Sequence, residues 1–312
     1  MTKVLAVSEY YNEAENIPSL VKNLSQQTMK PDHIVIIDDG STDDSTKIYQ
    51  ENLERYSLEN TLYTMPPKAK PDANLKGRAF TKVDILNSDW LETSDYDYLM
   101  LIGADTLFPK TYIEICTKIM DHFPMFGTIA GRIHGESGSD TPMGTGKIVR
   151  WDVVKKTRGR YWDLDPDSLW NLIAIEMGYR MVIPKDLLVT VTRPTHMYGL
   201  KGYYNYGRRM YYVGWKLFNA IAYSASLLAR RKHPQHFLRG YLHAFTEGTW
   251  RCRDPEVIDY FGFPRMLRRN LRLAHHRDFA TILDIGMTPD LETEITSDFL
   301  QMAFSKIQAA IR

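Results

Sequence analysis

One stretch constrains the fold of this chain more than any other: residues 34–46, with the sequence IVIIDDGSTDDST. Its first four residues are apolar and mostly β-branched, which is typical of a buried strand. The strand ends in two adjacent carboxylates, Asp38 and Asp39, and the glycine that follows permits a tight turn. Ser41 or Thr42 can then cap a helix. The stretch therefore predicts a strand–turn–helix unit with acids at the carboxyl end of the strand.

The carboxylates at the tip of this strand leave two interpretations open. In open α/β sheets, ligands bind at the carboxyl ends of the strands, so Asp38 and Asp39 would face a ligand. Asp43 and Asp44 would lie in the first turn of the helix, where they suit its dipole but repel a phosphate. A nucleoside base, ribose hydroxyls or a metal ion would match these acids better. The alternative is a well-capped turn whose acids are solvated.

The composition of the whole chain is that of an ordinary globular protein, with 312 residues, 44% hydrophobic and 25% charged. This length allows one large α/β domain, or one domain with an extension. The two cysteines, Cys116 and Cys252, lie far apart in the sequence, which favours a reducing compartment and argues against a metal cluster. The first apolar run, residues 3–8, is typical of a strand and too short for a signal peptide. We therefore expect a cytoplasmic protein.

Strand-like and helical patterns alternate in the first part of the chain. The strand-like runs lie at residues 3–8, 34–37, 60–64 and 96–102. This alternation predicts a mostly parallel sheet with right-handed crossovers. Three strand tips would then converge on one edge and carry Glu13, Asp38 with Asp39, and Asp105. Acids at three neighbouring tips favour a polar ligand and a divalent metal.

Four segments resemble glycosyltransferase family 2, whose members have the GT-A fold. Residues 4–17 (VLAVSEYYNEAENI) look like the opening strand and loop of the family. Residues 37–46 (IDDGSTDDST) are similar to its strongest motif almost residue for residue. Residues 74–79 (NLKGRA) resemble the turn that follows, and residues 103–106 (GADT) resemble the metal-binding Asp-x-Asp segment. The resemblance is high over about the first third of the chain and weak after position 195.

This resemblance implies a GT-A (Rossmann-like) α/β fold, with a mostly parallel central sheet flanked by helices. A nucleotide-sugar glycosyltransferase domain would occupy residues 1–195. Beyond the resemblance, the residues themselves predict that 196–312 form a basic, aromatic and mainly helical extension that contacts the acceptor or a membrane surface. The implied activity, in polysaccharide or glycan biosynthesis, is an inverting transfer of a sugar. The donor would be a nucleotide-diphosphate sugar, the acceptor a saccharide or a lipid-linked molecule, and the cofactor Mg²⁺ or Mn²⁺.

The resemblance also assigns roles in donor binding to individual positions. Asp39 and Asp38 would contact the nucleoside of a UDP- or GDP-linked sugar, and Glu13 would lie beside the base or ribose. Asp105 would ligate the metal bound to the donor diphosphate. His196 is a further candidate contact for the metal or a phosphate, with a purely structural role as its alternative. The remaining candidates for donor contacts are Ser8, Tyr10 and Ala104, with the cations Lys76, Arg78 and Lys147 for the diphosphate. Solvation at the surface is the alternative for these three cations.

The sequence departs from the family pattern in two segments. Glu9 and Tyr10 replace its usual Pro-Thr, and Gly103 replaces the first acid of Asp-x-Asp. With Asp105 alone, the metal would rely on few protein ligands together with diphosphate oxygens and water, which is reasonable for a hard ion. The missing acid motivates a second hypothesis, in which the chain is a catalytically weakened GT-A-like module that binds nucleotide or lipid.

An acidic segment before a predicted helix supplies the candidate catalytic base. In the family an acid precedes such a helix shortly before a Gly-Tyr-Arg sequence. Gly178 fixes that register here, so Asp167 falls on the catalytic acid. An inverting displacement needs a base within hydrogen-bond reach of the acceptor hydroxyl. Asp165 and Asp163 are alternatives, and helix capping is the competing role for Asp165 or Asp167. If the acceptor is a phosphate, no base is required.

The C-terminal part of the chain is basic and aromatic. No acid occurs from Arg193 through Thr246, and eight aromatic residues interleave with cations over residues 199–232. Residues 210–229 carry one charge, Lys216, and are almost long enough to span a bilayer. Their polar residues and basic flanks fit a helix at an anionic membrane surface better, which agrees with a polyprenyl-linked acceptor at the cytoplasmic face. An ordinary packed helix is an equal alternative. Nucleic-acid binding is not expected, because the acidic strand tips oppose it.

Overall fold

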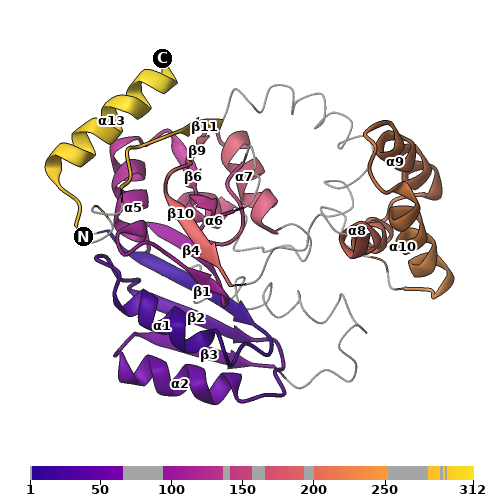
Figure 1. Ribbon diagram of the computed structural model, residues 1–312, viewed down its shortest axis with the longest axis horizontal. Coiled ribbons are helices and arrows are strands. Elements are labelled where there is room, and N and C mark those ends of the chain that lie inside the picture. Colours follow the sequence, from indigo (N-terminus) through magenta and orange to yellow (C-terminus); the bar gives the residue numbers. More distant parts are fainter. Residues whose placement is uncertain are drawn as a thin grey trace. The chain divides into compact units, whose positions relative to one another are not determined.

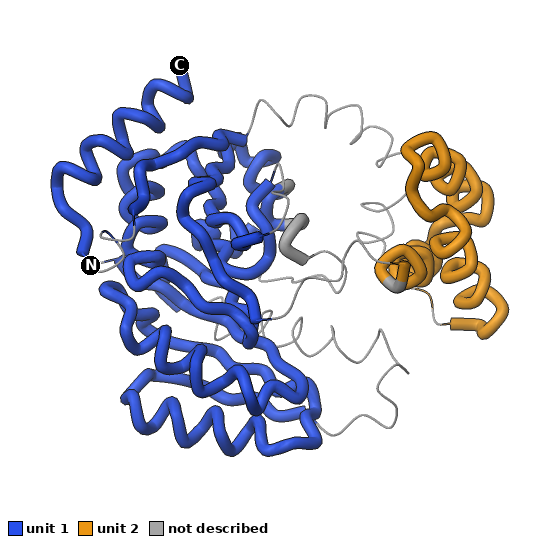
Figure 2. Tube along the Cα trace, viewed as in Figure 1, with its two compact units in different colours: residues 1–192, 278–312 blue, residues 193–277 orange. Residues whose placement is uncertain are grey.

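The chain forms two compact units in the computed structural model, and each is described by itself (Figure 2). Unit 1 comprises residues 1–192 and 278–312, and unit 2 comprises residues 193–277. This division differs from the predicted boundary, because the chain returns to unit 1 after the helical segment instead of ending in it. The residues that the structure describes are 2–65, 94–135, 141–156, 166–192, 200–249, 251, 280–288, 291 and 294–312.

Unit 1 is built on an eight-stranded sheet (Figure 1). Its strands are β1 (Val4–Tyr10), β2 (His33–Asp38), β3 (Asn60–Thr64), β4 (Tyr98–Gly103), β6 (Phe126–Ile129), β8 (Ile148–Arg150), β9 (Arg180–Pro184) and β11 (Ala280–Leu283). They lie in the order β11-β9-β6-β8-β4-β1-β2-β3. Neighbouring strands are parallel, except that β8 runs antiparallel to β4 and β6. The predicted mostly parallel α/β sheet is therefore confirmed.

A second, three-stranded sheet lies at the end of β4. Its strands are β5 (Thr106–Leu107), β7 (Arg132–Ile133) and β10 (Leu188–Val191), in the order β5-β10-β7. Strand β10 is antiparallel to β5 and parallel to β7. Because β5 begins directly after the turn that ends β4, the small sheet fixes that turn, which carries Asp105.

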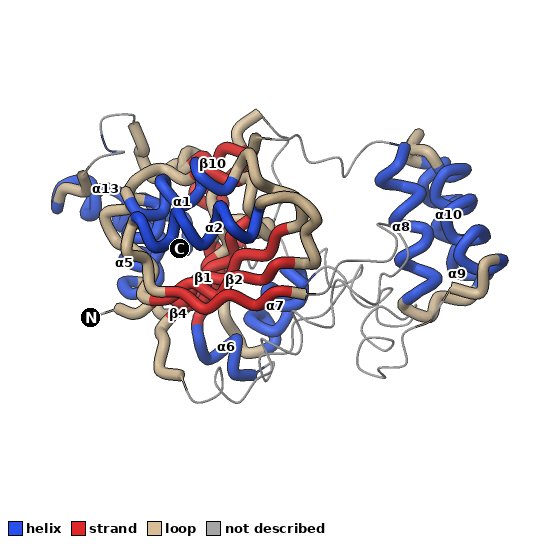
Figure 3. Tube along the Cα trace, turned by 90° about the horizontal axis from the view of Figure 1, so that it is seen from below, coloured by secondary structure: helices blue, strands red, loops and turns tan. Residues whose placement is uncertain are grey.

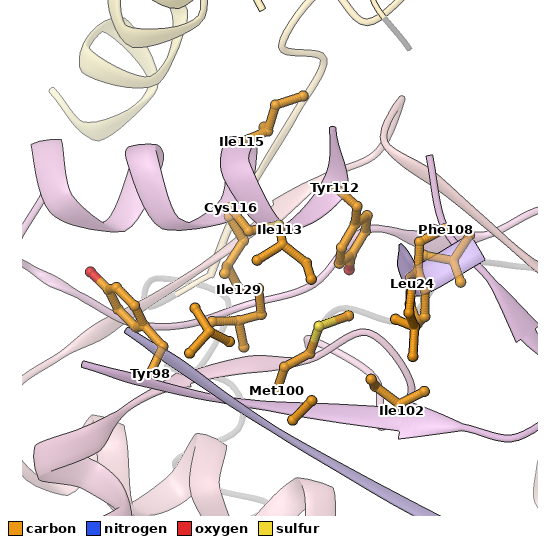
Figure 4. Packing of buried hydrophobic residues seen from close by; sticks show 14 of the residues in the cluster. Leu24, Tyr98, Met100, Ile102, Phe108, Tyr112, Ile113, Ile115, Cys116 and Ile129 are labelled. Atoms are coloured by element: carbon orange, nitrogen blue, oxygen red, sulfur yellow. The ribbon is translucent and has the colours of Figure 1, made fainter. Parts of the chain in front are cut away.

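Helices cover both faces of the large sheet (Figure 3). One face packs against α1 (Ile17–Ser25), α2 (Ser45–Arg55), α5 (Tyr112–His122) and α13 (Ser297–Ile311), and the other packs against α6 (Trp151–Lys156) and α7 (Pro166–Glu176). Alternate side chains of a strand point to opposite faces, so Ala6 belongs to the first cluster and Leu5 to the second. Figure 4 shows Met100 of β4 beneath Tyr112 and Ile113 of α5.

Two loops set the limits of neighbouring elements in unit 1. Helix α1 begins at Ile17, because the residues between it and β1 form a loop at the tip of β1. Strands β6 and β7 are separate, with Ala130 and Gly131 between them. A Cβ atom at Gly131 would lie 2.0 Å from the carbonyl oxygen of Leu187, so the turn before β10 passes too close for any larger residue.

The C-terminal residues complete unit 1. Strand β11 pairs with β9, and α13 buries Phe299, Ala303 and Ile307 against the core. The carboxylate of Asp186 accepts hydrogen bonds from the three successive backbone N–H groups of residues 285–287, at 2.6–2.9 Å. These charge-assisted bonds tie the segment after β11 to the turn between β9 and β10.

Unit 2 contains α8 (Leu200–Tyr212), α9 (Leu217–Ala229) and α10 (Pro234–Thr246), so its predicted helical character is confirmed. Helices α8 and α10 meet backbone to backbone, since a Cβ atom at Gly207 would lie 1.9 Å from the carbonyl oxygen of Phe237. Most of the aromatic residues of these three helices pack inside the unit. The ring pairs include Tyr206 with Phe237, Tyr211 with Tyr241, and Trp215 with Tyr223.

The apolar run over residues 210–229 is divided between two helices. Helix α8 ends at Tyr212, Gly214 has a φ of 89°, and α9 begins at Leu217. Within the described part of the chain, no helix combines the length and the apolar character that crossing a membrane requires.

Candidate active site

The candidate site lies at the carboxyl ends of β4, β1 and β2, which are neighbours in the large sheet. Tyr10 is level with Asp38 across the pair of β1 and β2, and Glu9 is level with Gly103 across the pair of β1 and β4. The three strands therefore end at the same height. The structure thus places the tips that carry the predicted acids at one edge of the sheet, as the alternation of strands and helices indicated.

Asp38 holds the turn between β2 and α2. Its Oδ1 accepts the backbone N–H of Ser41 at 2.8 Å, and its Oδ2 accepts the hydroxyl of Thr46 at 2.5 Å. The hydroxyl of Tyr10 donates to Thr46 Oγ1 at 3.1 Å. Burial raises the pKa of Tyr10, and the nearby Asp38 carboxylate adds to the increase. Both oxygens of Asp38 thus serve the turn, whereas the next residue, Asp39, is the buried acid that begins the loop.

The residues expected to cap α2 instead join two loops. Helix α2 begins at Ser45, after Asp44 at the N-cap position, so neither Ser41 nor Thr42 caps it. Ser41 Oγ accepts the backbone N–H of Asn12 at 3.0 Å, and the side-chain oxygen of Asn12 accepts the N–H of Thr42 at 2.8 Å. Asn12 has a φ of 53° at this junction. The loops after β1 and β2 therefore form one hydrogen-bonded rim.

Asp43 also lies outside the helix, contrary to the prediction that it occupies the first turn. Its Oδ1 accepts both the backbone N–H and the hydroxyl of Ser45, at 3.0 and 2.5 Å. Burial alone would raise the pKa of Asp43, but these hydrogen bonds outweigh it, and the pKa is lowered. Asp43 thus stays charged and fixes the start of α2.

A chain of hydrogen bonds connects Glu13 with the turn that carries Asp105. Glu13 Oε2 accepts the side-chain amide of Asn16 at 2.6 Å, and the backbone N–H of Glu13 donates to Ser45 Oγ at 2.7 Å. The hydroxyl of Thr192 donates to the side-chain oxygen of Asn16 at 2.9 Å. The backbone N–H of Thr192 donates to the carbonyl oxygen of Asp105 at 2.9 Å. The tip of β1, the end of β10 and the turn after β4 are thereby joined.

The position of the missing acid has no space for a side chain. A Cβ atom at Gly103 would lie 2.7 Å from Thr106 Oγ1, 3.1 Å from Thr145 Oγ1 and 3.2 Å from Asp105 Oδ1. The backbone N–H of Gly103 donates to Thr145 Oγ1 at 3.0 Å, and the two threonine hydroxyls lie 2.8 Å apart. Ala104 is buried beside them. Two hydroxyl groups therefore fill the space that the first carboxylate of Asp-x-Asp would need.

The residues around Asp105 fit a metal ion that takes most of its ligands from water and phosphate oxygens. Across the described residues, no group of three or more His, Cys, Asp and Glu side chains is arranged to hold a metal ion. Asp105 is half-buried, and its Oδ1 faces the space beside Thr106 and Thr145. Carboxylate and hydroxyl oxygens are hard donors, which suit Mg²⁺ or Mn²⁺ when water and phosphate oxygens supply the other ligands.

Asp167 lies in the first turn of α7, and only its place in the helix is described. Helix α7 precedes β9, which is parallel to β6, and the turn between helix and strand is closed by the N–H of Tyr179, which donates to the carbonyl of Ala174 at 2.8 Å. A crossover helix runs antiparallel to the strand that follows it. The N-terminal turn of α7 is therefore directed to the edge where the strands end. Buried Trp170 and Asn171 anchor this turn.

The remaining predicted site residues are either fully buried or lie outside the described residues. Ser8 is fully buried and accepts the hydroxyl of Tyr49 at 3.2 Å, so it supports the site from within the sheet. Burial raises the pKa of Tyr49 to about 12. Lys147 is also fully buried, directly before β8. Five candidates lie outside the described residues: Lys76, Arg78, Asp163, Asp165 and His196.

Sequence reasoning missed three residues that assemble the site: Asn16, Thr145 and Thr192. Each acts through a contact with a segment far away in the sequence. Their only sequence signal is a polar side chain in a loop, and such residues are common in turns of every function.

Comparison with a known sequence gives one short match. Over 56 residues the chain is 36% identical to a cholesterol galactosyltransferase from Borreliella burgdorferi. This segment covers 18% of the chain and spans only 16% of the length of that relative.

Two solved structures share the fold over nearly the whole chain. The mannosyltransferase PcManGT from Pyrobaculum calidifontis, in complex with GDP-Man and Mn²⁺, has a TM-score of 0.51 and 16% identity, and the match covers 98% of this chain and 87% of that chain. TarS from S. aureus has a TM-score of 0.50 and 15% identity, with 99% and 54% covered. These neighbours confirm the predicted GT-A fold.

The sequence of the sheet domain also matches a family model. The match, to "Glycosyl transferase family 2", extends over residues 7–188 and contains every strand tip described above. Because it covers more than half of the chain, this protein belongs to glycosyl transferase family 2.

Proposed function

We propose that this protein transfers a sugar from a nucleotide-diphosphate donor to a saccharide or lipid-linked acceptor, with inversion at the anomeric carbon and with help from Mg²⁺ or Mn²⁺. The observation that carries the proposal is the hydrogen-bonded assembly of three strand tips around Glu13, Asp39 and Asp105. Membership of glycosyl transferase family 2 supports it. The mannosyltransferase of the same fold was solved with GDP-Man and Mn²⁺, which agrees with this choice of donor class and metal.

In this proposal Asp39 and Glu13 contact the nucleoside. Both are buried carboxylates on loops that the neighbouring tips hold in place, which reduces the conformational entropy lost when a ligand binds. Carboxylates accept hydrogen bonds from ribose hydroxyls and base N–H groups. Asp38 positions the turn that carries Asp39, because both of its oxygens are engaged within the protein.

Asp105 and His196 would hold the metal, with diphosphate oxygens and water as further ligands. When bound, the ion neutralises the charge that develops on the leaving nucleoside diphosphate. The backbone of Asp105 is fixed by Thr192, four positions before His196 in the sequence. Lys76 and Arg78 are proposed as additional contacts of the diphosphate.

Asp167 is proposed as the base that accepts the proton of the acceptor hydroxyl, with Asp165 as the alternative. Inversion requires attack on the face opposite the leaving nucleotide, so the base and the diphosphate must lie on opposite sides of the sugar. The direction of α7 supports this role, because its first turn is directed to the carboxyl edge of the sheet.

The experiment is a turnover assay with a panel of UDP- and GDP-linked sugars, in which nucleotide release is measured with Mn²⁺, with Mg²⁺ and with a chelator. We expect release with at least one donor, and a loss of at least about 100-fold for Asp105→Asn, because a metal contributes several kcal/mol to such a step. Asp298→Asn, an exposed carboxylate in α13, is the matched control and should keep full activity. Undiminished metal-dependent release by Asp105→Asn would refute its role.

A second function is favoured by one observation, the two hydroxyl groups in the place of the first metal-binding acid. In that case the protein is a GT-A-like module that binds nucleotide or lipid with little turnover. Calorimetric nucleotide binding without release from any donor in the panel would identify this second function and reject the first.

A further inference from the structure

The proposed sugar transfer does not account for the exposed apolar face of α9. Four large side chains of this helix are highly exposed: Phe218 (71%), Leu228 (68%), Ile221 (51%) and Leu217 (47%). At about 100° per residue, the four project within an arc of about 100° around the helix axis. The residues of α9 that are buried in unit 2, Ala220, Ser224 and Leu227, project within the adjoining arc of about 60°. The four exposed side chains therefore form one stripe, which we call the α9 stripe.

Cations lie at both ends of the α9 stripe. Lys216 precedes the helix, and Arg230, Arg231 and Lys232 follow it, all of them exposed. The helix itself contains no charged residue, and no acid occurs from Arg193 through Thr246. The surface around the α9 stripe is thus apolar along the helix and positive at its ends.

We propose that α9 binds in the plane of an anionic lipid membrane, with the α9 stripe inserted among the headgroups and the flanking cations on lipid phosphates. An amphipathic helix with an apolar face and basic residues is typical of such interfacial binding. The helix has 13 residues and is about 20 Å long, which suits a position along the surface.

Charge complementarity favours a lipid surface over two other occupants. A second copy of this chain would bring the same cations toward each other, with no acids from the neighbouring sequence to offset them. A nucleic acid would pair with the cations but would leave the α9 stripe uncovered. An anionic membrane offers negative charge and an apolar layer together.

The inference goes beyond the proposed function, because it concerns a surface of unit 2 and can be measured without any donor or acceptor. If the protein does not bind membranes, the turnover assay still tests the proposed function. If no donor is turned over, vesicle binding still tests the present inference.

The test is co-sedimentation of the full chain with vesicles of phosphatidylcholine, alone or mixed with phosphatidylglycerol. We expect partitioning to the anionic vesicles to be at least about tenfold stronger and to weaken with salt, since each cation near such a surface contributes about fivefold. Phe218→Ser/Ile221→Ser/Leu228→Ser should lower binding by at least about tenfold. Met125→Ser/Met302→Ser, which removes exposed apolar side chains of unit 1, is the matched control and should bind as the unchanged protein does.

The contribution of the cations is tested separately. Arg230→Ser/Arg231→Ser/Lys232→Ser should remove most of the preference for anionic vesicles. The control with the same change of net charge replaces the exposed lysines of unit 1 at positions 30, 47 and 110 with serine and should keep the preference. Circular dichroism melting checks that each variant is folded, which is expected because the replaced side chains are exposed.

A second measurement reports insertion directly. Relative to the unchanged protein, whose six tryptophans supply the background emission, Phe218→Trp should add emission that is blue-shifted with anionic vesicles and quenched by brominated lipid chains, whereas the emission added by Met125→Trp should show neither effect. Absence of vesicle binding by the unchanged protein at low salt, or equal binding by the triple serine variant of the α9 stripe, would overturn the proposal. So would a dimer, found by analytical ultracentrifugation, that the triple variant dissociates while neither protein binds vesicles.

Discussion

Restoring a side chain at Gly103 should destabilise unit 1 and should not improve metal binding. A Cβ atom there would lie 2.7 Å from Thr106 Oγ1 and 3.1 Å from Thr145 Oγ1, closer than a carbon and an oxygen normally approach. Thr106 is fully buried, so it has little room to move. Overpacking of this kind costs about 1–3 kcal/mol, and loss of the hydrogen bond between the two hydroxyls adds about 1 kcal/mol. We therefore expect Gly103→Ala to lower the free energy of unfolding by about 2–4 kcal/mol.

The assay is urea unfolding followed by circular dichroism, combined with Mn²⁺ titration in the presence of nucleotide. Gly103→Asp should lose at least as much stability as Gly103→Ala and should bind Mn²⁺ no more tightly. A double-mutant cycle with Thr106→Ala isolates the contact. When the threonine hydroxyl is absent, the loss of unfolding free energy caused by Gly103→Ala should become smaller by more than about 1 kcal/mol, which is the contribution of about one hydrogen bond. A Gly103→Asp protein with unchanged stability and tighter Mn²⁺ binding would refute this steric argument.

Four further outcomes test other parts of the structure. Asp38→Ala should lower the melting temperature as well as activity, because both carboxylate oxygens hold the turn, whereas Asp39→Ala should affect mainly nucleotide binding; equal melting temperatures would contradict the distinction. The pKa of Tyr49 is raised from 10.0 to about 12. The protonated phenol therefore contributes fully to the free energy of unfolding below pH 10, and about 3 kcal/mol of that free energy is lost as the pH rises through 12. Urea unfolding at several pH values should show a smaller alkaline loss for Tyr49→Phe, and an identical pH dependence would exclude this cause. Gly207→Ala should destabilise unit 2 by about 3 kcal/mol or more, because the new Cβ meets a backbone carbonyl; near-ultraviolet circular dichroism would follow the loss, and normal melting would count against it. Asp186→Ala should increase hydrogen exchange at residues 285–287, and unchanged protection there would show that the carboxylate is dispensable.

The sheet could be predicted from the sequence because its strands are short apolar runs with clear ends. Strand β3 begins at Asn60 and ends at Thr64, as expected from the sequence, and β2 extends the predicted run by one residue at each end. Parallel strands place their carboxyl ends at one edge, so the convergence of Glu13, Asp39 and Asp105 also followed from the pattern.

The hydrogen bonds that join the loops of the site could not be predicted, because they connect segments that lie far apart in the sequence. Thr145 reaches the N–H of Gly103 across 42 positions, and Thr192 reaches Asn16 across 176. Asp38 and Asp39 have the same chemistry in the sequence, and only the positions of Ser41 and Thr46 distinguish them. The sequence also gives little indication that β11 joins the sheet, since a strand of four residues is too short to show a distinctive hydrophobic period.

The pairing of β11 with β9 has a consequence for the order in which the protein folds during synthesis. Ala280 pairs with Met181, so the ribosome must make all of unit 2 before β11, the second neighbour of β9 beside β6, exists. Until then β9 is an open edge strand, and open edges invite pairing with other chains. The helices of unit 2 pack on one another, α8 mainly on α10, and can fold during this interval. The nascent sheet therefore ends at β9 while unit 2 is being translated, and β11, a strand of four residues, then replaces β9 as the edge strand.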